Sequence, residues 1–176
     1  MKRYVVLLRG INVGGKNKLS MKELKLLFEN IGYKDIVTYI NSGNIIFSSN
    51  ENEIQIKETC EREIMNTFHL DLQVKIISVE ELSNALDNVP DWWDQDKRLK
   101  HNAIFVIPPS TAKELVEKVG FSEYERVSYH GSVIFWSAHL ENFSKTKWSK
   151  AVSTTLSKSV TIRNANTTKK LLEIGK

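Results

Sequence analysis

Two stretches of this chain align without a gap at a constant offset of 88 residues. Residues 31–47 match residues 119–135: each begins with an aliphatic residue, a glycine and an aromatic residue, and each ends in a turn followed by an apolar run. Upstream of each lie an apolar strand pattern and a capping-box pattern that starts a helix, Ser20-x-x-Glu23 and Thr111-x-x-Glu114. The repeat restricts the fold to two units built from the same order of elements.

Each half predicts the order strand, helix, strand, tight turn, strand, helix, strand. The first and last strands of the first half are expected at residues 4–8 and 72–77, and those of the second half at residues 103–107 and 160–163. The second helices of the two halves are expected at residues 54–68 and 146–156. The order βαββαβ is that of the ferredoxin-like unit. The sequence therefore predicts an α+β fold of two tandem, duplicated ferredoxin-like units, with mostly antiparallel sheets and a C-terminal helix at residues 167–174. The units are expected at residues 1–78 and 100–176, joined by a helical linker at residues 79–99.

The first half carries a glycine-rich segment that the second half lacks. Residues 9–17 (the glycine loop, Arg-Gly-Ile-Asn-Val-Gly-Gly-Lys-Asn) follow the first strand, where the second half has only Pro-Pro-Ser. Glycines let a backbone turn sharply and approach a ligand closely, and Arg9 and Lys16 add positive charge. The loop predicts a nest of backbone N–H groups that binds an anion. A loop that merely packs between the halves is the alternative.

The glycine loop falls one residue short of a nucleotide-binding P-loop. Gly10, Gly15 and Lys16 match G-x-x-x-x-G-K, but Asn17 stands where that motif needs Ser or Thr. The helix-start pattern at Ser20 comes four residues after Lys16, and the expected sheet is antiparallel rather than parallel. The pattern is therefore not that of an ATPase.

The charge of the chain is concentrated at its two ends. The net charge is +4, made of +6 over residues 1–25, −9 over residues 26–143 and +7 over residues 144–176. If the fold brings the ends together, one face becomes strongly positive; the alternative is two solvated basic ends that never meet. The last strand passes into the last helix at Arg163-Asn164-Ala165-Asn166-Thr167, where Asn and Thr are typical N-caps. With Lys170 the same segment forms a basic cluster at a helix N-terminus, where anions bind.

These features predict that a phosphate-bearing small ligand, a nucleotide or a phosphorylated metabolite, binds in a basic cleft made by both segments. The expected ligand-binding residues are Arg9, Asn12, Gly14, Gly15, Lys16, Asn17, Arg163, Asn164, Asn166 and Lys170. Binding of RNA or DNA through the same basic face is the second hypothesis. A structural or protein-interaction module without a ligand is the third.

Other constellations in the sequence point to packing rather than chemistry. No residue qualifies as a nucleophile or general base, no cofactor is indicated, and no histidine or cysteine has metal-ligand spacing. Cys60 is expected in the core and Trp92 and Trp93 over a sheet face. Residues 130–135 lack the aromatic positions of an RNA-recognition motif. No apolar run is long enough to span a bilayer, so we expect no membrane partner, and a single cysteine fits a cytoplasmic protein.

Three motifs together resemble the bacterial domain of unknown function 1697 family. They are residues 9–17, the segment Tyr39-Ile40-Asn41-Ser42-Gly43-Asn44, and Thr161-x-Arg163-Asn164-x-Asn166-Thr167-x-x-Lys170. The resemblance runs over essentially the whole chain and implies a small cytosolic protein with duplicated ferredoxin-like halves. The family has no established activity, so the resemblance implies a fold and leaves the function open. The family usually has Trp where this chain has Ala165, so no stacking role carries over to that position.

Overall fold

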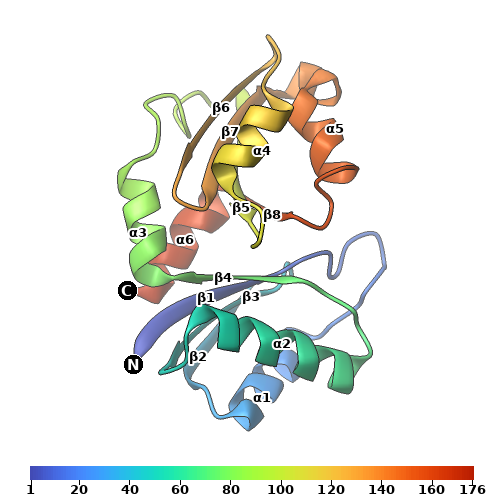
Figure 1. Cartoon of the computed structure of the whole chain (residues 1–176), viewed down its shortest axis with the longest axis vertical. Coiled ribbons are helices and arrows are strands. Elements are labelled where there is room, and N and C mark those ends of the chain that lie inside the picture. Colours follow the sequence, from blue (N-terminus) through green and yellow to red (C-terminus); the bar gives the residue numbers. More distant parts are fainter. The chain divides into compact units, whose positions relative to one another are not determined.

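The computed structural model describes all 176 residues as an α+β fold with two antiparallel four-stranded sheets and a C-terminal helix (Figure 1). The elements of the first half are β1 (Lys2–Leu8), α1 (Met21–Ile31), β2 (Lys34–Tyr39), β3 (Asn44–Ser49), α2 (Glu53–Phe68) and β4 (Val74–Ser78). Helix α3 (Val79–Asp87) follows. The second half contains β5 (Leu99–Val106), α4 (Ala112–Val119), β6 (Glu125–His130), β7 (Val133–His139), the 3-10 helix η1 (Leu140–Lys145), α5 (Lys147–Ser153), β8 (Val160–Asn164) and α6 (Ala165–Gly175).

The two sheets have the same strand order. The first is β2-β3-β1-β4 and the second is β6-β7-β5-β8, and every pairing in both is antiparallel. The 88-residue offset links Phe47 of β3 to Phe135 of β7, so the expected hairpins occupy matching places in the two sheets. The offset does not extend to the strand register, because the partners of these two residues, Tyr4 and Ala103, are 99 positions apart. Phe47 lies in the cluster with the helices of its half, whereas Phe135 lies outside the corresponding cluster and packs on Trp93.

Each sheet buries one face against two helices. In the first half, Leu24 and Phe28 of α1 and Ile56 and Cys60 of α2 are fully buried in one cluster with alternate residues of β1 such as Val6. In the second half, α4 and α5 cover the sheet in the same way. Apolar side chains at helical spacing produce this packing because they lie on one side of each helix. Cys60 is a core residue, as expected.

Helix starts are set by local capping. Ser20 and Thr111 accept hydrogen bonds from the backbone N–H groups of Glu23 and Glu114, as the sequence predicts. The glutamate side chains do not return a bond, so these are simple N-caps. The one reciprocal capping box in the chain lies at Asn52, which opens α2. Thr146 caps α5, which ends at Ser153 instead of continuing to residue 156, and η1 was not predicted.

The chain divides into two units, Met1–Leu82 with Lys170–Lys176, and Ser83–Lys169. The end of the chain thus lies in the first unit, whereas the sequence grouped it with the second half. Arg3 Nε donates to the carbonyl oxygen of Gly175 at 3.4 Å, and Gly175 lies so close to Val79 that an added Cβ would be 2.7 Å from it. Among the helices, none combines the length and the apolar character that crossing a bilayer requires.

In the second unit, Trp93 covers part of the sheet. Its side chain is 2% exposed, its ring packs edge-on against Phe135 with centroids 5.1 Å apart, and its Nε1 donates to the carbonyl oxygen of Asn102 at 2.9 Å. Packing over a sheet face, rather than base stacking, is therefore the role of Trp93, as the sequence suggested.

Candidate functional site

The glycine loop is a miniature hairpin. Lys16 N–H donates to the carbonyl oxygen of Val13 at 3.0 Å, and the two residues form an isolated antiparallel bridge. Gly14 and Gly15 between them have φ values of 57° and 75°, as a type I′ turn requires. A Cβ on either glycine would meet nothing within 4 Å. The glycines are therefore needed for their backbone conformation, and not for a close approach within the protein.

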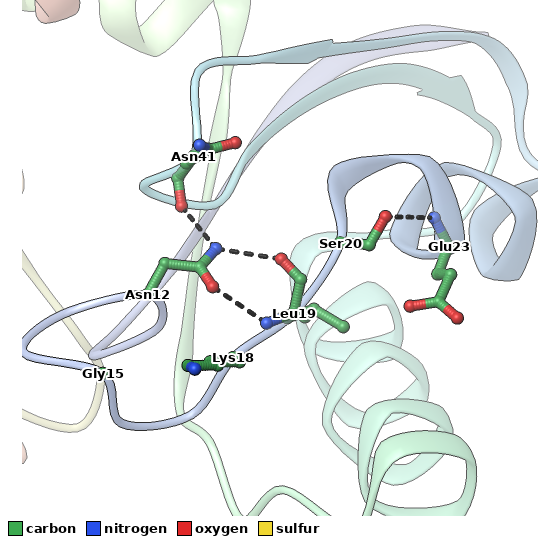
Figure 2. A pocket seen from close by; sticks show the side chains of 7 residues that line it. All are labelled: Asn12, Gly15, Lys18, Leu19, Ser20, Glu23 and Asn41. Carbon is green, nitrogen blue, oxygen red and sulfur yellow. Dashed lines mark hydrogen bonds between the residues drawn. The ribbon is translucent and has the colours of Figure 1, made fainter.

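Asn12 holds this hairpin against two other segments (Figure 2). Its Nδ2 donates to the carbonyl oxygens of Leu19 at 2.9 Å and Asn41 at 2.8 Å, and its Oδ1 accepts from Leu19 N–H at 2.9 Å. Asn17 Nδ2 closes the base of the loop on the carbonyl oxygen of Gly10 at 2.9 Å. Both asparagines, expected as ligand-binding residues, thus use their side chains to build the loop.

The turn between β2 and β3 packs closely on the strand that leads into the loop. Leu8 N–H donates to the carbonyl oxygen of Gly43 at 2.8 Å. A Cβ on Gly43 would lie 2.8 Å from Leu8 Cβ and from Ile11 Cδ1, and Gly43 has a φ of 83°. Only glycine fits this position, so Gly43 of the Asn41-Ser42-Gly43-Asn44 motif meets a packing requirement in this fold.

A pocket of about 570 Å³ opens between the glycine loop, the β2–β3 turn and the start of α1 (Figure 2). Its lining consists of Asn12, Gly15, Lys18, Leu19, Ser20, Glu23 and Asn41. The volume is in the range of small-molecule sites in proteins. All the lining residues belong to the first unit, so one folded unit contains the whole pocket.

The pocket, together with Gly14 and Lys16 of the neighbouring loop tip, which lie outside its lining, offers hydrogen-bond donors and charge of both signs. Lys18 is exposed and its ammonium group has no protein partner; the same holds for Lys16 at the loop tip. The backbone N–H groups of Gly14 and Gly15 donate to no protein atom, whereas those of Asn12 and Lys16 are used within the loop. Free N–H and ammonium groups suit an anionic ligand, and the exposed carboxylate of Glu23 suits a ligand group that donates hydrogen bonds.

Arg9 lies at the base of the loop and outside the pocket lining. It is half-buried, its backbone N–H donates to the carbonyl oxygen of Gln73 at 3.2 Å, and burial lowers the pKa of its guanidinium. Of the loop residues expected to bind a ligand, Asn12 and Gly15 line the pocket; Arg9, Gly14, Lys16 and Asn17 do not.

The second predicted segment serves mainly to start the last helix. Asn164 Oδ1 accepts from Thr167 N–H at 2.8 Å and is the N-cap of α6. Arg163 is 7% exposed, its Nη1 donates to Thr161 Oγ1 and to the carbonyl oxygen of Ile162, and burial lowers its pKa to about 10. Asn166 is exposed. These three residues belong to the second unit, so their convergence with the glycine loop stays a prediction.

Lys170 belongs to the first unit. Its Nζ donates to Glu173 Oε1 at 2.9 Å, and this hydrogen-bonded ion pair raises the pKa of the ammonium group. The residues that sequence reasoning missed as a pocket lining are Lys18, Leu19, Ser20, Glu23 and Asn41. One sequence feature could have indicated this lining: Lys18 is a cation two residues before Ser20, the N-cap of α1.

Two groups outside the pocket that could have catalytic chemistry, the His101–Ser137 pair and Cys60, are buried. His101 Nδ1 lies 2.6 Å from Ser137 Oγ and its Nε2 lies 2.7 Å from the carbonyl oxygen of Asp96, but Ser137 is 1% exposed. Burial raises the pKa of the Cys60 thiol, which keeps it protonated. No group of three or more His, Cys, Asp or Glu side chains could hold a metal ion.

Comparison with known proteins identifies relatives but no activity. No protein with a curated description matches the chain. A solved structure of the conserved bacterial protein SP0830 from Streptococcus pneumoniae is 32% identical in sequence, with a TM-score of 0.88 over 99% of each chain. The model of the DUF1697 family, described as proteins of unknown function, matches residues 1–135. The chain therefore belongs to the DUF1697 family.

Proposed function

We propose that the protein binds a phosphate-bearing small molecule in the pocket beside the glycine loop. The observation that carries this proposal is the pocket itself: about 570 Å³, placed at a loop that one asparagine fastens to two other segments, with the unpartnered ammonium group of Lys18 in its lining. Ligand sites need such a rigid setting because a mobile loop would have to be ordered at the expense of affinity.

The chemistry of the lining suits a phosphate group. Lys18 and the N–H of Gly15 can both donate to phosphate oxygens, and a phosphate carries enough acceptors for both. The first turn of α1 adds the positive end of its dipole. Glu23 opposes a bare anion, so the ligand should also carry hydroxyl or amino groups that donate to this carboxylate. A sugar phosphate or a nucleotide meets both conditions.

Charge reversal at one lysine tests the proposal. Binding of ATP, GTP and a short single-stranded RNA is titrated calorimetrically at 50 and 200 mM salt. We expect nucleotide affinity to fall roughly tenfold in Lys18→Glu, since one charge-assisted hydrogen bond is worth about 1.5–3 kcal/mol and an exposed one less. Lys25→Glu is the matched control, because Lys25 is exposed on α1 and does not line the pocket. Equal nucleotide affinity in both variants would contradict the proposal.

Nucleic acid is the second candidate ligand, favoured by the net charges of +6 and +7 at the two ends of the chain. The same titration separates the two. A protein that neutralises ~6 phosphates loses roughly a thousandfold in affinity between 50 and 200 mM salt, whereas a mononucleotide held by one or two cations shows a far shallower dependence. Tight RNA binding with a steep salt slope, without nucleotide binding, would favour this candidate. Binding of none of the three would favour the structural or protein-interaction module.

We also propose that the two halves are copies of one ferredoxin-like unit in a cytoplasmic protein. The matching strand orders, with Phe47 in β3 and Phe135 in the corresponding strand β7, support the duplication. An experimental structure in which those two residues occupy non-equivalent strands would contradict it. The single buried cysteine supports the cytoplasmic location, which cell fractionation would test.

A further inference from the structure

Ile40, in the turn between β2 and β3, has an unfavourable backbone conformation. Its φ is 48°, in the left-handed region that β-branched residues rarely adopt. Its side chain is 48% exposed, so the conformation does not serve to bury it in the core. Glycine or asparagine would fit the backbone here at less cost. Something other than folding stability must account for isoleucine at this position.

Two asparagine side chains hold Ile40 in this conformation. Asn44 is fully buried, and its Nδ2 donates at 2.9 Å to the carbonyl oxygen of Tyr39, the residue before Ile40. Asn12 Nδ2 donates at 2.8 Å to the carbonyl oxygen of Asn41, the residue after it. The peptide group before Ile40 and the one after Asn41 are therefore fixed, the first by a buried side chain and the second by a side chain of the glycine loop. Strain that the surroundings maintain in this way is typical of ligand-binding sites.

The position of Ile40 connects it to the pocket. Asn41, the next residue, lines the pocket, and its carbonyl oxygen is the one that Asn12 binds (Figure 2). Asn12, the donor of this hydrogen bond, is followed in the glycine loop by Val13, which is 66% exposed. Ile40 and Val13 are thus chain neighbours of two residues that line the pocket, and both carry exposed aliphatic side chains.

We propose that Ile40 contacts an apolar, planar part of the ligand, which makes the ligand a nucleoside phosphate rather than a sugar phosphate or inorganic phosphate. This inference rests on the proposed function: the phosphate binds near Lys18 and the base lies against Ile40. The base has a flat apolar face that an exposed aliphatic side chain can cover. A sugar phosphate has no such face, so Ile40 would add nothing to its binding.

The experiment compares AMP, ribose 5-phosphate and inorganic phosphate, the first two of which carry the same phosphate group. Each is titrated into the full-length protein and into Ile40→Asn, which suits the positive φ and removes the apolar contact. Ile54→Asn is the matched control, because Ile54 is 70% exposed on α2 and does not line the pocket. Thermal unfolding of both variants is measured alongside.

We expect the wild type to bind AMP about tenfold more tightly than ribose 5-phosphate, the factor that covering roughly half of an isoleucine side chain supplies. In Ile40→Asn the ratio of the AMP affinity to the ribose 5-phosphate affinity should fall to about one, because the apolar contact is lost. The affinity for ribose 5-phosphate and the thermal stability should stay unchanged. Ile54→Asn should keep the wild-type ratio. Equal affinity of the wild type for AMP and ribose 5-phosphate, or an unchanged ratio in Ile40→Asn, would overturn the inference and leave the proposed function standing. Failure of all three compounds to bind would overturn both.

Discussion

Replacing Glu125 with glutamine tests how far one buried carboxylate stabilises the second unit. Glu125 is 7% exposed, and its two oxygens accept five hydrogen bonds. Oε2 accepts from the N–H and hydroxyl of Ser122 and from Lys147 N–H, the two N–H bonds being 2.9 and 2.7 Å long. Oε1 accepts from Trp136 Nε1 at 3.2 Å and Trp148 N–H at 3.1 Å. The carboxylate thus joins the start of β6 to β7 and to the first turn of α5.

Glutamine has nearly the same shape but the wrong hydrogen-bonding pattern. A carboxylate only accepts, whereas the NH₂ group of a glutamine side chain only donates. Whichever way the amide turns, this group faces at least two N–H donors. Hydrogen bonds to a charged group contribute about 1.5–3 kcal/mol each, and the half-buried Ser122 and exposed Lys147 recover part of the loss by bonding to water. Two such bonds are lost in Glu125→Gln, and bonding to water makes the loss smaller than their sum. We therefore expect the free energy of unfolding to fall by ~3 kcal/mol.

Tryptophan fluorescence measures this effect in the second unit alone. All four tryptophans, at positions 92, 93, 136 and 148, lie in that unit. Urea unfolding followed by their emission gives the free energy of unfolding from the midpoint and slope. Glu117→Gln is the matched control, because Glu117 is exposed on α4, and it should change stability by less than ~0.5 kcal/mol. A Glu125→Gln protein within about 1 kcal/mol of the wild type would refute the reasoning.

Two further predictions concern the first unit. Asn12→Ala removes three hydrogen bonds of a half-buried side chain. We expect the free energy of unfolding, measured by circular dichroism, to fall by about 2 kcal/mol, and protease cleavage within residues 10–18 to become faster. Cleavage at the wild-type rate would show that the loop does not depend on Asn12. Lys75 is 3% exposed, and burial lowers the pKa of its ammonium below the ordinary 10.5, although Glu81 and Glu53 oppose the shift. The folded protein therefore releases this proton at a lower pH than the unfolded chain does. As the pH rises from the lowered pKa to 10.5, the free energy of unfolding of the wild type should increase relative to that of Lys75→Met. A constant difference between the two proteins across that range would contradict the burial effect.

Much of the secondary structure follows from short-range patterns that the sequence displays directly. The side chains of the N-caps Ser20, Thr111 and Asn164 each accept a hydrogen bond from the backbone N–H three residues later. This short spacing is visible in the sequence. The 88-residue repeat predicted matching hairpins, and Phe47 and Phe135 lie in the corresponding strands β3 and β7. Burial of Cys60 followed from its helical spacing to apolar neighbours. Such signals are readable because the interacting groups lie within one turn or one hairpin.

The candidate site depended on contacts that no local pattern encodes. Asn12 reads as a loop residue with a free amide, but the fold brings it to Asn41, 29 positions away, and the side chain becomes part of the loop's structure. Glu125 reads as an ordinary surface glutamate until α5 brings Lys147 N–H to it from 22 positions away. Arg163 reads as an exposed cation and is buried. By itself, the sequence determined the order of most helices, strands and turns, because backbone hydrogen bonds and capping act over a few residues. Only the tertiary structure decided which polar side chains build the pocket and which remain available to a ligand, because that depends on which distant segments pack together.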